Sequence, residues 1–128
     1  MPTEVPLHIL IVDPDISSAH VTRAIVARAA PDARISVEPD AEQACRKLAR
    51  LLPDVLIVDP SPSLLAGLKL IATVKGQHAG QVIVVASAPS LGLRRRMHAL
   101  GVDLYLEKPA PLLVSDLRTF LNSTQGKP

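Results

Sequence analysis

The chain has 128 residues, the size of one domain, and 48% of them are apolar. Tyr105 and Phe120 are the only aromatic residues, which disfavours a platform for stacking nucleic-acid bases. Its 14 basic and 12 acidic residues give a net charge of +2, too small an excess to indicate direct nucleic-acid binding. The single cysteine, Cys45, excludes an internal disulfide, and no apolar run approaches the length of a membrane span, so we expect a soluble cytoplasmic protein without a membrane partner.

The first predicted strand, residues 7–12, contains the aliphatic run of residues 9–12, which ends at Asp13. Such a run, without polar alternation, is typical of a parallel strand covered by helices on both faces. A helix is predicted from Ile16 to the break at Pro31. The strand predicted over residues 34–37 alternates in polarity, so we expect it near an edge of the sheet.

The second helix is predicted from an apolar stripe of helical period that follows Asp40. Asp40 and Gln43 resemble a capping box. The stripe consists of Ala41, Ala44, Cys45, Leu48 and Leu52. No histidine or basic cluster is arranged to lower the pKa of Cys45, so we expect a small buried side chain there, with a reactive thiol as the alternative.

The third predicted strand, residues 55–58, repeats the first. Residues 56–60 are identical to residues 10–14, so this strand also ends at an Asp-Pro pair. The carboxyl ends of parallel strands lie at one edge of the sheet, where ligands bind. We therefore expect Asp13 and Asp59 to meet at that edge.

The alternation of strand and helix continues to the end of the chain. A proline- and serine-rich loop over residues 60–67 precedes a helix, and a strand over residues 81–86 precedes a helix that carries Arg94, Arg95 and Arg96. A fifth strand around residues 104–106 and a last helix lead to a polar tail, residues 122–128. This pattern predicts one α/β domain over residues 1–128, with its core in residues 7–121.

Several residues stand in a characteristic order and spacing along this pattern. They are Asp13, Pro53-Asp54 before the strand that ends in Asp59, Gly67 eight positions after Asp59, and residues 99–101 leading through Tyr105 to Lys108-Pro109. Together they resemble the receiver domains of two-component response regulators, over about residues 7–121. The resemblance implies a flavodoxin-like three-layer αβα sandwich, with a five-stranded parallel sheet of order 2-1-3-4-5 and five helices.

The resemblance also implies a phosphoacceptor site. Asp59 would accept a phosphoryl group from a histidine kinase or phosphotransfer protein, and Lys108 would pair with the phosphate. Mg2+ would be held by Asp13, Asp59 and the backbone carbonyl of Ser61.

Two positions depart from the family pattern and make the acidic pocket degenerate. Pro14 stands where a second acid usually helps to hold Mg2+, so we expect weak Mg2+ binding unless Asp15 reaches into the pocket. The switch hydroxyl, counted back from Lys108, falls on Ala86, and Ser87 would replace it only if the strand ends early. The alternative is that Asp13 and Asp59 are polar strand-end residues satisfied by loop amides.

Two functions remain open after these departures. The first is a receiver in phosphorelay signal transduction, phosphorylated on Asp59. The alternative is a phosphorylation-independent pseudo-receiver that acts as a protein–protein interaction module. An enzyme or a nucleotide carrier is not expected, because the residues after the first strand form no glycine-rich or serine- and threonine-rich phosphate loop.

A downstream protein partner is expected on the surface of the fourth helix, fifth strand and fifth helix. Leu104 stands where the family commonly has an acid that pairs across a symmetric dimer. With Tyr105 and the arginines 94–96, it predicts a contact patch for an acidic partner segment or another domain. The alternative is an ordinary solvated basic face.

Overall fold

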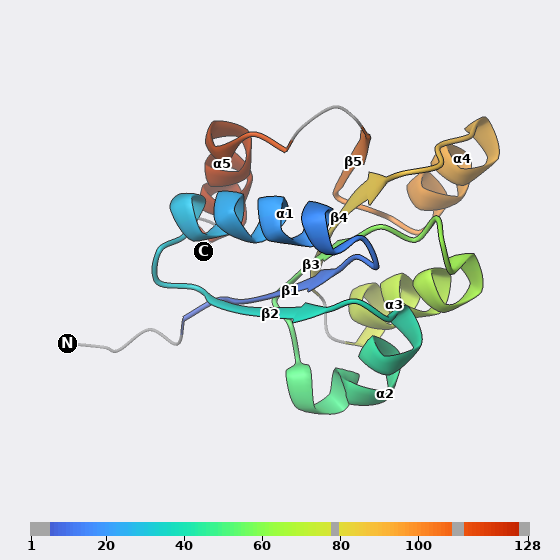
Figure 1. Ribbon diagram of the computed structural model, residues 1–128, viewed down its shortest axis with the longest axis horizontal. Helices are drawn as coiled ribbons and strands as arrows, with labels where there is room; N and C mark the ends of the chain where they lie inside the picture. Colours follow the sequence, from blue (N-terminus) through green and yellow to red (C-terminus); the bar gives the residue numbers. More distant parts are fainter. Residues whose placement is uncertain (1–5, 78–79, 109–111, 126–128) are drawn as a thin grey trace.

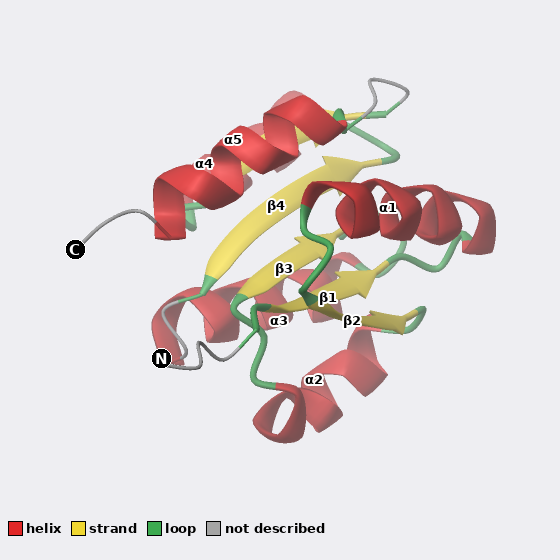
Figure 2. Ribbon diagram, turned by 90° about the vertical axis from the view of Figure 1, so that its left-hand side faces the viewer, coloured by secondary structure: helices red, strands yellow, loops and turns green. Residues whose placement is uncertain are grey.

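The computed structural model describes residues 6–77, 80–108 and 112–125, and these form a parallel sheet between two layers of helices (Figures 1 and 2). The strands are β1 (His8–Val12), β2 (Arg34–Glu38), β3 (Val55–Val58), β4 (Gln81–Ala86) and β5 (Leu104–Glu107). The helices are α1 (Ile16–Ala29), α2 (Ala41–Leu51), α3 (Leu64–Gln77), α4 (Leu91–Ala99) and α5 (Val114–Gln125). The sheet order is β2-β1-β3-β4-β5, which confirms the predicted topology and the edge position of β2.

Successive residues of the central strands face opposite sides of the sheet and enter two different apolar clusters. The cluster on the side of α1 and α5 contains Ile9, Ile11, Val26, Val55, Ile57, Ile83, Leu112, Leu117 and Leu121. The larger cluster joins the other face to α2, α3 and α4, through residues such as Leu10, Leu48, Leu56, Ile71, Val84 and Met97. Because both faces are covered, the central strands are aliphatic except at the first residue of β1, His8, and of β4, Gln81.

The two identical segments lie side by side in the sheet. β1 and β3 pair in parallel, with Leu10 opposite Leu56, Ile11 opposite Ile57 and Val12 opposite Val58. The next residue of each segment is its aspartate. The register therefore delivers Asp13 and Asp59 to the same edge, as the sequence predicts.

The ends of α2 differ from the sequence prediction. Asp40 caps the helix, but its side chain accepts a hydrogen bond from the N–H of Glu42, and it is Glu38 that accepts from the N–H of Asp40. The predicted pairing of Asp40 with Gln43 is therefore wrong. Leu52 does not belong to the buried stripe, because it follows the helix in a left-handed conformation with φ of 41° and is 55% exposed.

Cys45 lies on the partly buried side of α2. Its Sγ atom donates to the carbonyl oxygen of Ala66 at 3.6 Å, and burial raises the pKa of the thiol. A raised pKa lowers the fraction of reactive thiolate, which agrees with the expectation of an inert side chain.

Two further helix limits differ from the sequence prediction. α3 begins at Leu64, so Gly67 lies in its first turns and not in the preceding loop, and α5 continues to Gln125, into the predicted tail. No helix in the described part of the chain is long and apolar enough to cross a membrane.

Candidate functional site

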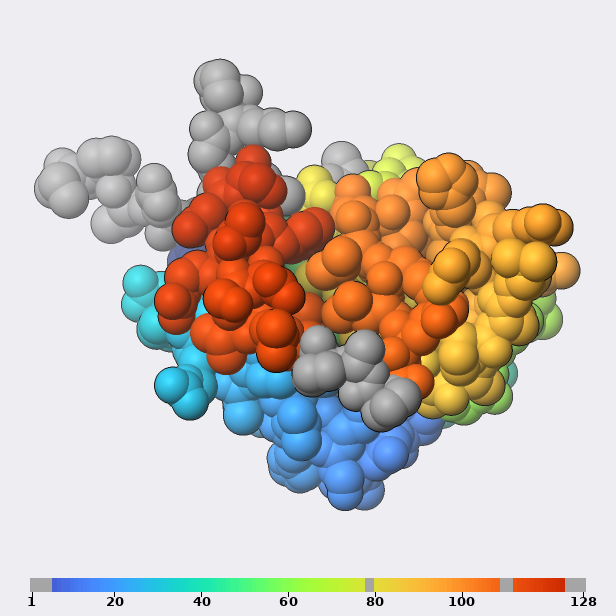
Figure 3. Space-filling view, turned by 90° about the horizontal axis from the view of Figure 1, so that it is seen from above, coloured from blue at the N-terminus to red at the C-terminus, as the bar shows by residue number. Residues whose placement is uncertain are grey.

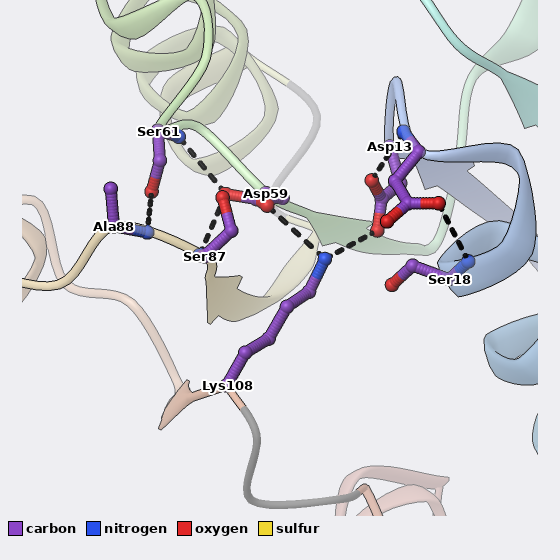
Figure 4. A network of polar contacts seen from close by, with 8 residues as sticks. Asp13, Ser18, Asp59, Ser61, Ser87, Ala88 and Lys108 are labelled. Carbon is purple, nitrogen blue, oxygen red and sulfur yellow. Dashed lines mark hydrogen bonds and ion pairs between the residues drawn. The ribbon is translucent and has the colours of Figure 1, made fainter.

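Two carboxylates lie buried at the edge of the sheet where the strands end. Asp13 follows β1 and is 6% exposed, and Asp59 follows β3 and is 5% exposed. Buried carboxylates require partners that offset their lost hydration. Figure 4 shows that the partners come from the loops after β1, β3, β4 and β5.

Lys108 lies between the two carboxylates. Its Nζ atom is 3.0 Å from Oδ2 of Asp13 and 3.2 Å from Oδ2 of Asp59. The backbone N–H of Lys108 donates to the carbonyl oxygen of Ala86 at 2.9 Å, which continues the pairing of β4 with β5. The position of the ammonium group thus depends on the register of these two strands. Pro109, the next residue of the predicted motif, lies outside the described residues.

Backbone amides bind the remaining oxygens of the two carboxylates. Oδ1 of Asp59 accepts from the N–H of Ser61 at 3.0 Å and from the N–H of Ser87 at 3.2 Å. Oδ1 of Asp13 accepts from the N–H of Asp15 at 2.9 Å. Each of the four oxygens therefore already accepts a hydrogen bond within the protein.

Ser87 lies beside Asp59 because β4 ends at Ala86, the condition on which its predicted site position depended. The hydroxyl oxygen of Ser61 accepts from the N–H of Ala88 at 3.1 Å, and this bond ties the loop after β3 to the loop after β4. The sequence does not indicate that the amide of Ala88 contributes to the site. No side-chain pattern could have indicated it, because a backbone donor carries no signature in the residue type.

Opposite shifts in pKa keep both Asp59 and Lys108 charged. Burial opposes ionisation of Asp59, but hydrogen bonds from Ser87 and Ser61 and the charge of Lys108 outweigh it, so the pKa of Asp59 lies below its ordinary value. Burial likewise opposes protonation of Lys108, but Asp13 and Asp59 outweigh it and raise the pKa of the lysine. The site therefore contains a carboxylate and an ammonium group in contact at neutral pH.

Asp15 does not supply the missing acid. Its side chain accepts from the N–H of Ser18 at 3.3 Å and caps α1, so its carboxylate is used at the helix end. Among the residues that the structure describes, no group of three or more His, Cys, Asp and Glu side chains could hold a metal. Asp13, Asp59 and the carbonyl of Ser61 are hard oxygen donors of the kind that Mg2+ accepts, but they are few.

An open pocket of about 390 Å3 adjoins Asp59 on the side away from Lys108's strand. Its lining includes Pro14, Pro39, Asp40, Pro62 and Ser63, which come from the loops after β1, β2 and β3. Asp59 thus borders this pocket, although its side chain is only 2% exposed.

The fold is that of known receiver domains. The chain is 22% identical to the signal receiver domain of a DNA-binding response regulator from Colwellia psychrerythraea, with a TM-score of 0.79 over 94% of this chain and 99% of that one. It is 20% identical to a response regulator receiver domain protein from Methanospirillum hungatei, with a TM-score of 0.78 over 95% of each chain. It is 27% identical to the N-terminal domain of an uncharacterized protein from Wolinella succinogenes, with a TM-score of 0.78 over 94% of each.

No protein-family model and no curated protein matches the sequence. The structural likeness therefore carries the assignment: the chain has the fold of response-regulator receiver domains, as its sequence features predict. Within that fold, the edge where Asp13, Asp59 and Lys108 meet is the place where ligands of doubly wound sheets bind.

Proposed function

We propose that the chain is a signal receiver in a two-component phosphorelay and that Asp59 accepts the phosphoryl group. This proposal rests on the environment of Asp59. Its carboxylate is buried and ionised, and it contacts one ammonium group and two backbone N–H groups. These donors are what a phosphoryl group requires, because its transfer depends on positioning and on neutralising the charge of its oxygens.

The reaction would transfer a phosphoryl group from a phosphohistidine of a kinase or phosphotransfer protein. A carboxylate oxygen of Asp59 forms a bond to phosphorus as the phosphorus–nitrogen bond breaks, and the electron pair leaves with the imidazole, which then takes up a proton. The product is an acyl phosphate. Asp59 is consumed once in each cycle, so the chain is the receiver of the group and not itself an enzyme that turns over a small substrate.

The donors around Asp59 would then bind the phosphoryl oxygens. Lys108 would move its ammonium group from the carboxylates to the phosphate, and the N–H groups of Ser61 and Ser87 would donate to it, with the hydroxyl of Ser87 beside them. Mg2+, when bound by Asp13, Asp59 and the Ser61 carbonyl, would neutralise further charge. We propose that it binds weakly, because Pro14 offers no oxygen and Lys108 already contacts Oδ2 of both carboxylates.

A downstream protein partner would bind the surface formed by α4, β5 and α5, which lie together in Figure 3. On this surface the guanidinium of Arg94 lies 3.2 Å from Glu107 and 5.8 Å from the centre of the Tyr105 ring, and the Tyr105 hydroxyl donates to Glu107 at 3.0 Å. Leu104 is half-buried against the cluster of α1 and α5, so it contributes less contact area than the sequence suggests. If Lys108 moves on phosphorylation, the adjoining Glu107 would shift with it and would change the contacts of Arg94 and Tyr105.

One observation favours the alternative of a phosphorylation-independent pseudo-receiver. Every carboxylate oxygen of the site has a donor without any added ligand, and Lys108 acts as the counter-ion that a metal would otherwise provide. In that case the surface of α4, β5 and α5 would keep a single conformation, and the chain would act as a protein–protein interaction module.

Treatment with acetyl phosphate and Mg2+, followed by intact-mass measurement, tests the proposal. The wild type should gain the mass of one phosphoryl group, whereas Asp59→Asn should gain none, since an amide is not a competent nucleophile there. Asp116→Asn, which removes an exposed carboxylate of α5, is the matched control and should react like the wild type. An unmodified wild type at saturating Mg2+ would favour the pseudo-receiver.

A further inference from the structure

A shallow, open apolar groove of about 580 Å3 lies between α3 and α4, two helices that pack on the face of the sheet opposite α1 and α5. Its lining is Leu65, Leu68, Ala72, Ala99 and Leu100, with Lys69 and Arg96. Leu65 is 85% exposed, the highest value among the large apolar side chains that the structure describes. None of these residues belongs to the acidic site. Arg96 and Ala99 lie on α4, which also contributes to the α4, β5 and α5 surface proposed above, and Arg96 is one of the arginines predicted to form that surface.

The segment that forms the groove has an unusual charge. Residues 60–102 include Lys69, Lys75, Arg94, Arg95 and Arg96 but no Asp or Glu. All 12 acidic residues and the other nine of the 14 basic residues lie elsewhere in the chain. Although the net charge of the whole chain is only +2, this segment is basic, and no acid on α3 or α4 can pair with the bases of the groove.

Acids from outside the segment neutralise two of the three bases away from the groove, and the third, Arg95, forms no ion pair within the described residues. Lys75 pairs with Asp103 at 2.9 Å, and Arg94 pairs with Glu107 at 3.2 Å. By contrast, Lys69 and Arg96, the two bases in the lining, form no ion pair within the described part of the chain. The groove thus combines an exposed apolar floor with two basic side chains that lack counter-ions.

We propose that this groove binds an acidic amphipathic helix of a partner protein. Apolar side chains spaced at i, i+4 and i+7 would lie against Leu65, Leu68 and Leu100, as helices do in apolar grooves. Carboxylates beside them would pair with Lys69 and Arg96 and would hasten association. The interaction is separate from phosphorylation, because it involves no residue of the acidic site.

The lining distinguishes this partner from two others. The bases of a single-stranded nucleic acid would need aromatic side chains on which to stack, and no aromatic residue lines the groove. A second copy of this chain offers no acidic helix: α1, α3 and α4 contain no Asp or Glu, whereas α2 has Glu42 among three basic residues and α5 has Asp116 with Arg118. A segment of another protein therefore fits the groove best.

Selection from a displayed library of helical peptides tests the proposal. The peptides are about 15 residues long, which is long enough for a peptide to form a stable helix when it binds. Their i, i+4 and i+7 positions vary between Leu and Ser, and the flanking positions vary between Glu, Gln and Lys. Selection against the whole chain should enrich Leu at the three positions and Glu beside them. Enrichment of Lys or Gln, or of Ser, would overturn the proposal.

Fluorescence anisotropy with the enriched peptide locates its site. Binding should weaken about tenfold for Leu65→Ser. The charge variant, which combines Lys69→Gln with Arg96→Gln, should bind about three- to tenfold more weakly, and its affinity should lose most of its dependence on salt. Leu113→Ser and Arg23→Gln, exposed positions just before α5 and on α1 respectively, are the matched controls and should bind like the wild type. Asp59→Asn should also bind like the wild type, which separates this test from that of the phosphoacceptor.

Three results would contradict the proposal. The first is unchanged affinity of the peptide for the Leu65 and the Lys69 with Arg96 variants. The second is binding of a single-stranded DNA oligonucleotide that only the charge variant abolishes, which would indicate a nucleic-acid surface. The third is self-association in sedimentation that Leu65→Ser abolishes, which would make a second copy the occupant. Circular dichroism of each variant shows that the fold is retained.

Discussion

A Cβ atom added to Gly67 would lie 2.7 Å from Cβ and 2.9 Å from Cα of Pro60, closer than side chains approach in folded proteins. Helix α3 therefore packs directly on the loop that follows the phosphoacceptor candidate. Pro60 stands between Asp59 and Ser61, whose N–H donates to Asp59. The glycine thus fixes the backbone of the site from the side of the helix.

Gly67→Ala should destabilise the protein by about 1–2 kcal/mol, because the contact with the Pro60 backbone outweighs the gain in helix propensity. Gly76→Ala, in the same helix, has no atom within 4 Å of the added Cβ and should instead stabilise by about 0.5 kcal/mol. Urea denaturation of both variants measures the difference. Equal effects of the two substitutions would show that the loop accommodates the added methyl group.

Lys108 should stabilise the native state mainly through the two carboxylates. Lys108→Ala leaves Asp13 and Asp59 buried without a counter-ion, and we expect it to lower the free energy of unfolding by about 1–3 kcal/mol. In a protein that already carries Asp59→Asn the same substitution should cost less, since only one carboxylate is left uncompensated. A double-mutant cycle from urea denaturation measures this coupling, and additive effects would contradict it.

The stabilisation by this pair should depend on pH at both extremes. Asp59 has a lowered pKa, so its contribution is present above the ordinary value of 3.8 and is lost as the pH falls through the folded-state pKa. Lys108 has a raised pKa, so its contribution is present below the ordinary value of 10.5 and is lost as the pH rises through the folded-state value. The difference in stability between wild type and Lys108→Ala should accordingly be constant from about pH 5 to pH 9 and shrink outside that range. A maximum at one end of this window would be inconsistent with the proposed pair.

Pro14→Asp should tighten Mg2+ binding by about tenfold, because it restores a carboxylate at the position where the resemblance expects one. Without metal the variant should be less stable than the wild type, since a third negative charge is added beside Asp13 and Asp59. Pro39→Asp adds a charge to the lining of the same pocket from a different loop and serves as the control. Calorimetric titration gives the affinities, and sub-millimolar binding by the wild type would refute the expected weakness.

Leu52→Gly should stabilise the protein by about 0.5–1 kcal/mol. The residue ends α2 with φ of 41°, a conformation that strains an L side chain but suits glycine, and its own side chain is 55% exposed. Leu52→Ala keeps the strained Cβ and should not stabilise. Thermal unfolding of the two variants distinguishes relief of backbone strain from a simple loss of exposed apolar surface.

The sequence predicted the parts of the site that depend on strand order. Asp13 and Asp59 end two aliphatic runs, so a parallel sheet had to bring them to one edge, and the register of β1 with β3 does so. The sequence predicts Ser87 as a site residue only on the condition that β4 ends early, because sequence patterns leave strand ends uncertain by a residue or more.

Other features of the structure depend on backbone geometry that the residue types do not determine. Asp15 could have turned toward Asp13 or capped α1, and only the path of the turn decides between the two. The groove between α3 and α4 was not predicted either. Its existence depends on how closely the two helices pack, whereas the apolar periodicity of each helix indicates only which face meets the sheet.

The in-register pairing of β1 with β3 has a consequence for folding at high concentration. Two copies of one aliphatic sequence lie in parallel with like residues adjacent, the arrangement that also builds the spine of amyloid fibrils. In an unfolded chain, either copy can pair with the same segment of another molecule as readily as with its neighbour. The yield of refolding should therefore fall with protein concentration, and the aggregates that form should contain parallel strands made from residues 9–12 and 55–58.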